Sequence, residues 1–401
     1  MYALDLDTAY SLALSNSFKV KLAKMAIDKV DIEKNKLWMS FLPEVNYKLS
    51  DGEEKYVIDG VDTSDSNNKD NTAHSLEMRL SLFNGGKDYL QYKIDSANYS
   101  LATCELELTQ LQIKLQVLEL YIQVYKLQQQ HKLQQQIVVK HGQKVAQLKQ
   151  QLDVSMTTKR QFLQAQSTEY LAQRQLQTLA LQISDYSLQL QQILQTPVAE
   201  LEIPQQTSVS NYSEFNLHPS VLQALYELKV SNANIHKQLT QFMPQLNLLA
   251  NWQQQQRLIY LDDTGGQRVE NTLLSLELTV PVFTGATNIT ALRLSYANYE
   301  MASVRYKMRQ DEIKHQMQTI KHKLATSSKQ LTLATKFTTS AQEILESETL
   351  DYQYGVINYL PVIEATIALL QSQQEQLLAQ AEELLYRNQL FLHLDSLQLT
   401  D

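Results

Sequence analysis

The side chains that could do catalytic or metal chemistry are scattered through this sequence. Its eight histidines have no spacing typical of a metal site, and we expect them to be solvated helix residues: His74, His131, His141, His218, His236, His315, His322 and His393. Asp262-Asp263 could bind Ca²⁺ weakly, but an exposed acidic loop is the favoured interpretation. Gly265-Gly266 is interpreted as a turn, because no lysine-bearing helix follows it. The sequence therefore predicts no catalytic residue, no metal site and no cofactor.

Composition limits the class of protein further. The net charge of −8 over 401 residues gives no electrostatic case for nucleic acid. Only 9 glycines and 7 prolines are present, so long elements are expected. Cys104 is the single cysteine, which excludes a disulfide within the chain and predicts a buried apolar position. No apolar run reaches the roughly eighteen residues of a spanning helix, so any membrane crossing would use strands.

The first residues, Met1-Tyr2-Ala3-Leu4, lack the basic segment and apolar core of a signal peptide. We therefore expect either a cytoplasmic protein or a mature chain whose export signal has been removed. No cysteine lies near the start, so an N-terminal lipid anchor is not expected.

An internal repeat controls the fold prediction. The stretch from Asn71 to Ala102 recurs from Asn271 to Ala302 at a constant offset of 200, without a gap. The positions that are identical in both copies are, in the first, Asn71-Thr72, Ser75-Leu76-Glu77, Phe83, Gly85, Ala97-Asn98-Tyr99 and Ala102. This agreement predicts a tandem duplication.

Each copy changes its periodicity at a glycine. Apolar and polar residues alternate up to Phe83 and up to Phe283, which predicts strands with one apolar face. Beyond Gly85 and Gly285 the pattern is helical for about seventy residues. The corners Phe83, Gly85, Phe283 and Gly285 are therefore predicted to convert strand into helix, with glycine supplying a backbone geometry that side chains resist.

The elements of the first half, residues 1–200, follow in a simple order. A helix capped by Asp7 or Thr8 is expected to run to about Met39. A β-hairpin (about 43–83) with an exposed loop (51–70), a long helix (about 86–154) and a return helix (about 159–196) are then predicted.

The second half, residues 201–401, repeats this order. After a linker, a helix is expected from Leu217 to about Gln241. It is followed by a β-hairpin (about 244–283) with an exposed loop (261–270), a long helix (about 285–354) and a return helix (about 359–399).

The long helices carry coiled-coil seams. Two neighbouring stripes are visible in the first helix: Leu111, Leu115, Leu118, Ile122 and Tyr125, and beside them Ile113, Val117, Leu120, Val124 and Leu127. The second helix repeats the latter stripe as Ile313, Met317, Ile320 and Leu324. Two stripes on one helix predict neighbours on two sides, as in a ring of helices. The predicted class is α+β, mainly α, with long coiled-coil hairpins.

Four strands cannot close a barrel, and a lipid-exposed open edge has no partner for its backbone groups. If these strands cross a membrane, several chains must share one barrel; three chains would give twelve strands. The helices of the three chains would then form a tube roughly 100 Å long.

Short motifs at the element boundaries carry a family resemblance. They are Leu6-Asp7 with Ala9 and Leu12-Ala13-Leu14, Leu42-Pro43 and Met243-Pro244, Leu82-Phe83-Asn84-Gly85-Gly86, Val280-Pro281-Val282-Phe283-Thr284-Gly285, and the run from Tyr352 to Ala365. Their order and spacing resemble the TolC-like outer-membrane efflux proteins over nearly the whole chain. The resemblance implies a homotrimer in the outer membrane of a Gram-negative bacterium, with its helical tunnel in the periplasm. It also implies a periplasmic adaptor protein and an inner-membrane pump of the RND, ABC or MFS type as partners.

The resemblance also assigns roles at the helix tips. It implies that adaptor docking uses the tip turns: Ser155, Met156, Thr157, Thr158, Gly355, Val356, Ile357 and Asn358. It places a gate at Tyr352, Glu364, Gln161 and Gln164, with Glu364 repeated around the axis as a weak cation-attracting ring. The family's usual acidic residue at Pro361 is missing, and Gln161 and Gln164 stand at the equivalent positions of the first half. Fewer charged links are therefore expected at this gate.

Three functions compete at this point. The duct of an efflux pump or a type I secretion system explains the strands and the corners. A soluble coiled-coil scaffold explains neither, and an enzyme would lack a site. For the duct, the alternation predicts lipid contact on one face and Glu77 and Glu277 in the lumen. The residues predicted to face lipid are Leu76, Met78, Leu80, Leu276, Leu278 and Val280. The cargo, whether drug, metal ion or polypeptide, is not readable.

Overall fold

The computed structural model describes residues 4–54, 69–197, 201–203, 215–257, 267–283 and 286–396. Two compact units can be separated in it. The helical unit comprises Met1–Met25, Cys104–Leu222 and Lys307–Asp401, and the sheet unit comprises Ala26–Thr103 and Gln223–Tyr306. Each unit draws on both halves of the chain.

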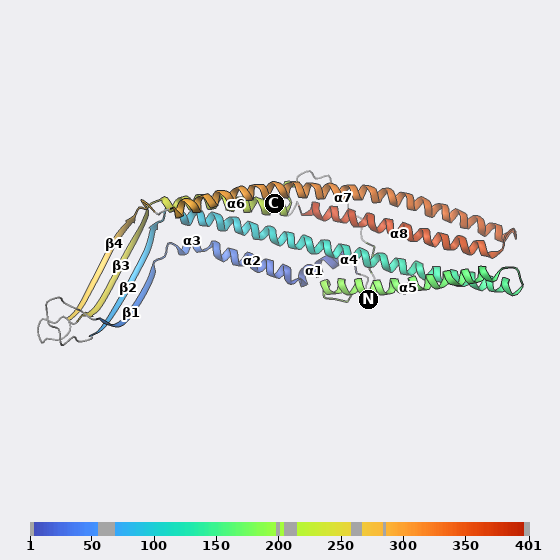
Figure 1. The fold of residues 1–401 in the computed structure, drawn as a ribbon, viewed down its shortest axis with the longest axis horizontal. Coiled ribbons are helices and arrows are strands. Elements are labelled where there is room, and N and C mark those ends of the chain that lie inside the picture. The colour runs from blue at the N-terminus through green and yellow to red at the C-terminus, as the bar shows by residue number, and fades with distance from the viewer. Residues whose placement is uncertain are drawn as a thin grey trace. The chain divides into compact units, whose positions relative to one another are not determined.

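The sheet unit contains four antiparallel strands in the order β1-β2-β3-β4 (Figure 1). Their bounds are Glu44–Glu54 for β1, Lys69–Phe83 for β2, Gln245–Arg257 for β3 and Gln267–Thr279 for β4. The four strands expected from the alternating patterns are therefore confirmed. In the described sheet β1 and β4 are edge strands, each paired on one side only.

The strand register gathers the apolar residues on one face. Tyr47 lies opposite Leu76, Leu76 opposite Trp252, and Leu248 opposite Leu276. Because side chains alternate along a strand, this apolar face holds Val45, Tyr47 and Leu49, then Leu76, Met78 and Leu80, then Leu246, Leu248, Ala250 and Trp252, and finally Leu274, Leu276 and Leu278. Val280 lies beyond the end of β4. The opposite face carries Glu77 and Glu277, and there Lys48 Nζ lies 2.6 Å from Glu77 Oε2.

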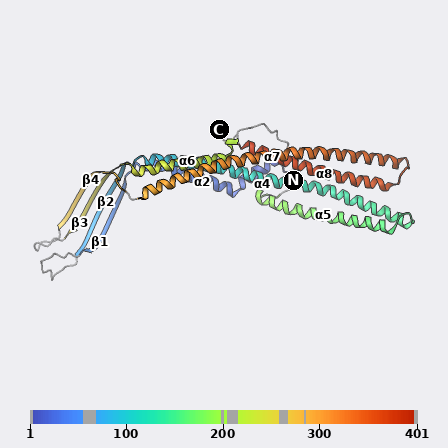
Figure 2. The same cartoon turned by 45° about the horizontal axis from the view of Figure 1, so that its top comes forward.

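Eight α-helices are described in the chain. They are α1 Leu6–Asn16, α2 Phe18–Lys34, α3 Lys36–Met39, α4 Lys87–Asp153, α5 Lys159–Leu194, α6 Pro219–Leu239, α7 Thr287–Gln353 and α8 Tyr359–Asp395. The long helices α4 and α7 each contain 67 residues, which is about 100 Å at the helical rise. Each return helix, α5 or α8, runs beside the end of its long helix (Figure 1, Figure 2).

The single N-terminal helix predicted up to Met39 is wrong. The structure breaks it into α1, α2 and α3, because Ser17 adopts an extended conformation and its hydroxyl accepts the N–H of Val20. That bond gives α2 a start of its own. The predicted cap is also wrong, since the N-cap of α1 is Asp5 rather than Asp7 or Thr8, and Asp5 makes no side-chain cap bond.

At the first corner between strand and helix, the local structure requires glycine at position 85. Gly85 has φ +69°, and a Cβ placed there would lie 2.6 Å from Cβ of Met243. A side chain would therefore face both backbone strain and a clash. Phe83, 52 % exposed, follows an irregularity in the register beside Ser81. The matching Gly285 lies outside the described residues, while Phe283 is 88 % exposed.

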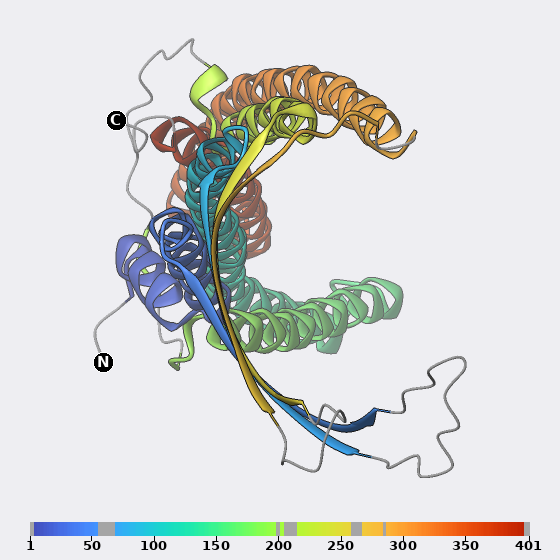
Figure 3. The ribbon, with the colours of Figure 1, turned by 90° about the vertical axis from the view of Figure 1, so that its left-hand side faces the viewer.

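In the helical unit four helices form an open arc in the order α5, α4, α8, α7 (Figure 3). Contacts at each step support this order. Gln134 of α4 donates to the Ala172 carbonyl of α5 and accepts from Gln374 of α8. Thr338 of α7 donates to the Ser372 carbonyl of α8. Helices α5 and α7 are thus the two ends of the arc.

The main core of this unit follows the predicted seams. Val117, Leu118 and Val124 are fully buried, and Cys104 is buried as expected. Tyr121 is also fully buried, and its hydroxyl donates to the carbonyls of Leu4 and Glu202. Tyr121 therefore fastens the start of the chain and the segment after α5 to the middle of α4.

Candidate functional site

The tip between α4 and α5 ends the first hairpin in a compact turn. The N–H of Met156 donates to the Gln151 carbonyl over 2.7 Å, and the N–H of Ser155 donates to the Leu152 carbonyl over 3.0 Å. This pair of bonds is the Schellman motif, which requires a left-handed residue after the helix. Ser155 fills that position with φ 63°, a conformation in which a side chain is strained.

The tip between α7 and α8 repeats the same motif. The N–H of Val356 donates to the Asp351 carbonyl over 2.9 Å, and the N–H of Gly355 donates to the Tyr352 carbonyl over 3.0 Å. Gly355 is the left-handed residue, with φ 70°. The two turns therefore share one backbone conformation at an offset of 200, although only the second has glycine at the left-handed position.

The two return helices begin with different caps. Thr158 caps α5 in a capping box, in which its hydroxyl accepts the N–H of Gln161 and the Gln161 side chain accepts the N–H of Thr158. Gln161 also accepts from the Thr157 hydroxyl over 2.7 Å. The side-chain oxygen of Asn358 caps α8 by accepting only the N–H of Leu360, over 3.0 Å.

Both tips expose apolar side chains. Met156 is 80 % exposed and Val356 71 %, at equivalent positions of the two turns, and Tyr354 is 81 % exposed. An exposed apolar pair at the ends of two neighbouring hairpins is a surface that a partner helix can cover.

The four residues predicted to form a gate have different neighbours within one chain. Tyr352 packs on Tyr359, with ring centroids 5.1 Å apart, and Gln161 is engaged in the capping box. Gln164 is exposed. Glu364 of α8 is paired with Lys144 of α4, with Nζ 2.7 Å from Oε1. Sequence reasoning missed Lys144, because nothing in one helix reveals its register against another.

A second polar cluster lies where α6 begins. His218 and His393 are buried with their rings stacked 5.6 Å apart. Nδ1 of His218 accepts the N–H of Ser220, so its proton is on Nε2, which lies 3.3 Å from Nδ1 of His393. Burial lowers the pKa of both imidazoles to about 4, with His393 and then Arg309 adding to the effect at His218. This chain of hydrogen bonds needs both rings neutral.

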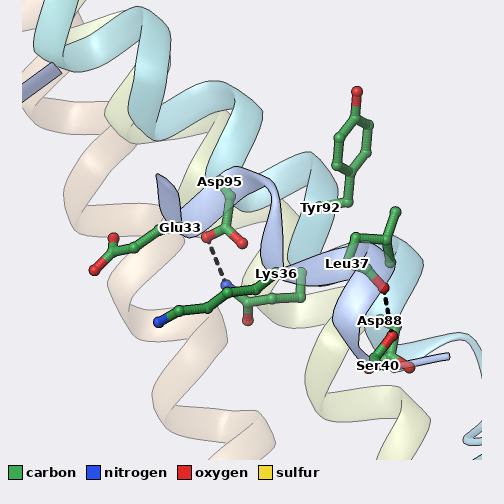
Figure 4. Close-up of a pocket in the computed structure, with 8 residues that line it drawn as sticks. Glu33, Lys36, Leu37, Ser40, Asp88, Tyr92 and Asp95 are labelled. Carbon is green, nitrogen blue, oxygen red and sulfur yellow. Dashed lines mark hydrogen bonds between the residues drawn. The ribbon is translucent and has the colours of Figure 1, made fainter. Parts of the chain in front are cut away.

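A surface cavity of about 460 Å³ in the sheet unit is lined by Glu33, Lys36, Asp88 and Asp95, among others (Figure 4). Asp95 accepts from Gln91 over 2.7 Å, and the Gln91 oxygen in turn accepts from Lys237 of α6. The Gln91 amide thus bridges Lys237 and the buried Asp95 carboxylate, and this chain of hydrogen bonds joins α4 to α6.

The described ranges contain no group of three or more His, Cys, Asp or Glu side chains arranged to hold a metal ion. Within the same ranges, no helix has the length and apolar character needed to cross a membrane.

A four-stranded sheet with one apolar face, joined to long coiled-coil hairpins, is the architecture of an outer-membrane channel subunit. The chain belongs to the outer membrane efflux protein family, whose sequence profile matches residues 9–195 and 213–394. The resemblance based on the corner and tip motifs is thereby confirmed.

Solved structures share this fold over nearly the whole chain. VceC, an outer membrane protein of Vibrio cholerae, is 18 % identical, with 98 % of this chain and 95 % of that chain covered and a TM-score of 0.78. CusC is 15 % identical over 98 % and 93 %, with a TM-score of 0.80. The open state of the Neisseria gonorrhoeae outer membrane channel MtrE is 16 % identical over 97 % and 88 %, with a TM-score of 0.77. At these identities the likeness concerns the fold. A search of curated protein sequences found no significant match.

Proposed function

We propose that three copies of this chain assemble into one duct: a shared barrel through the outer membrane and a helical tunnel in the periplasm. The duct is the passive exit of a tripartite efflux pump or a type I secretion system. Membership of the family supports the outer-membrane location. The edge strands of the sheet and the end helices of the arc support the assembly.

Unpartnered edges carry this proposal. The sheet has edge strands β1 and β4 and one exposed apolar face. The helical arc ends in α5 and α7, which expose apolar side chains along their lengths: Leu163, Tyr170, Leu171, Leu181 and Leu188 on α5, and Leu333, Phe337 and Ile344 on α7. Open edges at both ends of a curved element favour head-to-tail closure into a ring of copies.

The duplication predicts how two copies meet. Within one chain, Ile137 of α4 and Leu370 of α8 belong to one buried cluster. The long helix α7 repeats α4, and α5 repeats α8, at an offset of 200. The equivalent contact is therefore Phe337 of one copy against Tyr170 of the next, and both side chains are 58 % exposed in the single chain.

Disulfide trapping tests this assembly. In a Cys104→Ser background, the pair Tyr170→Cys and Phe337→Cys should link neighbouring copies, giving trimers on a non-reducing gel of the outer-membrane fraction. The pair Tyr170→Cys and Lys336→Cys is the control, since Lys336 follows a different line on α7 and should link poorly. Protein that stays cytosolic and unlinked would favour the scaffold alternative.

The tips supply the partner site in this proposal. A periplasmic adaptor, itself bound to an inner-membrane pump of the RND, ABC or MFS type, would dock on the turns 155–158 and 355–358. The exposed Met156 and Val356 support a helical partner there. Gating by Tyr352, Gln161, Gln164 and Glu364 rests on the family resemblance. Conductance of Tyr352→Phe with Gln161→Ala in planar bilayers tests it, and an increase is expected.

A further inference from the structure

A ladder of polar contacts fixes α8 against α4 in the helical unit. Gln134 of α4 bonds to Gln374 of α8, and Lys144 of α4 pairs with Glu364 of α8. The two positions are ten residues apart on each helix, as an antiparallel register requires. The same antiparallel register relates Glu119 to Gln389, and Lys114 pairs with Asp395 one residue out of step. Lys126 and Glu382, also in register, are close enough to interact electrostatically. The interface is therefore in one register along most of α8.

The rungs of this ladder differ in environment. Gln134 is 2 % exposed, and its neutral amide satisfies both Ala172 and Gln374. Lys144 and Glu364 form the rung nearest the tips, where the Glu364 side chain is 52 % exposed. A neutral link is thus placed in the interior, and a full ion pair is placed where water can reach it.

The interface proposed between copies, α7 of one copy against α5 of the next, has no such charge at this level. At an offset of 200, the counterparts of Lys144 and Glu364 are Ile344 and Gln164. Neither can form an ion pair, so the Lys144–Glu364 pair has no counterpart at that interface.

We propose that Lys144 sets the ion preference of the tip opening by cancelling Glu364 while α8 is seated on α4. Movement of α8 away from α4 separates the pair and leaves one free carboxylate per copy. The paired Glu364 then adds little to the ion preference of the tip, and the freed carboxylate adds a preference for cations. This inference rests on the proposed duct and replaces the permanent cation-attracting ring expected from Glu364 alone.

Reversal potentials in planar bilayers under a KCl gradient test the proposal. Lys144→Met keeps the aliphatic stem and removes the charge, so it should shift the potential towards cation preference. Lys144→Arg should keep the wild-type value. Adding Glu364→Gln to Lys144→Met should restore it, because no carboxylate then remains to attract cations.

Lys140→Met is the matched control, one helical turn earlier on α4, and should leave the potential at the wild-type value. A conducting Lys144→Met trimer with the wild-type potential would overturn the inference and leave the duct intact. Wild-type trimers without any conductance would overturn the duct and the inference together. A shift of equal size in Lys140→Met would also overturn it, because the effect would then be general rather than specific to the pair with Glu364.

Discussion

The two halves of this chain share backbone geometry and differ in chemistry. The Schellman turns at Ser155 and Gly355 agree in both hydrogen bonds, although one left-handed residue has a side chain. The starts of α2 and α6 both use a side-chain acceptor, but they differ in which N–H it binds. Ser17 accepts the N–H of Val20, and His218 accepts the N–H of Ser220.

This comparison separates what the architecture needs from what one half has added. Turns and caps are kept because each satisfies backbone groups at a helix end. The additions join the second half to its surroundings: the imidazole of His218 reaches His393, and Glu364 reaches Lys144. In the first half Gln161 instead stays within its own turn.

The largest effect is expected from substitutions in the sheet, where the two halves agree most. Leu76 and Leu276 stand at an offset of 200 on the apolar face, Leu276 62 % exposed. Arginine at either position should destabilise the membrane-inserted barrel by about 2–4 kcal/mol if the face meets lipid near the midplane. Heat resistance of the trimer on gels measures the loss.

Glu77→Gln and Glu277→Gln are the controls for the sheet. Both lie on the opposite face, and the exposed Lys48–Glu77 pair contributes at most about 1 kcal/mol. Greater damage from the glutamines than from the arginines would mean that the lipid and lumen faces are exchanged.

The next effect should appear only in the second half, as a dependence on pH. His218 and His393 have pKa values near 4 in the fold, below the usual 6.5, because they are buried. Above pH 6.5 both rings are neutral in the folded and in the unfolded chain, so their titration does not change the stability. As pH falls from 6.5 towards 4, the unfolded chain takes up protons that the fold excludes, so stability decreases, on the order of 3 kcal/mol for each ring.

Melting temperatures of wild type between pH 7.5 and 4.5 measure this decrease. His218→Ser with His393→Ile copies the first half, where Ser17 precedes α2 as His218 precedes α6, and Ile193 stands at an offset of 200 from His393. The double variant should show a flatter profile over this range. An unchanged slope would assign the acid sensitivity to other groups.

Sequence patterns predicted the elements that depend on periodicity and glycine. The alternation in β2 and β4 and the seam through Val117 and Val124 come from burial of one face, which a single element already encodes. The break at Ser17 was missed because its side-chain cap competes with an otherwise continuous helical pattern. The Lys144–Glu364 pair was unreadable, since it depends on the register of helices about two hundred residues apart. The spacing of Thr158 and Gln161 is that of a capping box, whereas the family resemblance assigns Gln161 to the gate.

A smaller effect tests whether the two tip turns are equivalent. Ser155→Gly should stabilise the protein by about 0.5–1 kcal/mol, because glycine adopts positive φ without strain. Gly355→Ser should cost a similar amount, and the double exchange should be close to neutral. Denaturant unfolding of the four proteins forms the cycle. A gain from Ser155→Gly without a matching loss from Gly355→Ser would show that the environments differ beyond φ.

The smallest expected difference lies in the caps of the return helices. Thr158→Ala removes the hydroxyl half of a reciprocal box, whereas Asn358→Ala removes a single bond to Leu360. Cap removal costs about 1 kcal/mol, and Thr158→Ala should be the more costly because it removes two bonds, the one that the hydroxyl accepts from the Gln161 N–H and the one that it donates to the Gln161 side chain. Hydrogen exchange at the first turn of α5 and of α8 measures each loss locally, where global unfolding would average it. Thr158→Ala with Gln161→Ala should add little to Thr158→Ala if the two side chains act only as a box. A large extra loss would mean that Gln161 acts beyond the box, through the bond that it accepts from the Thr157 hydroxyl or through a neighbouring copy at the tip.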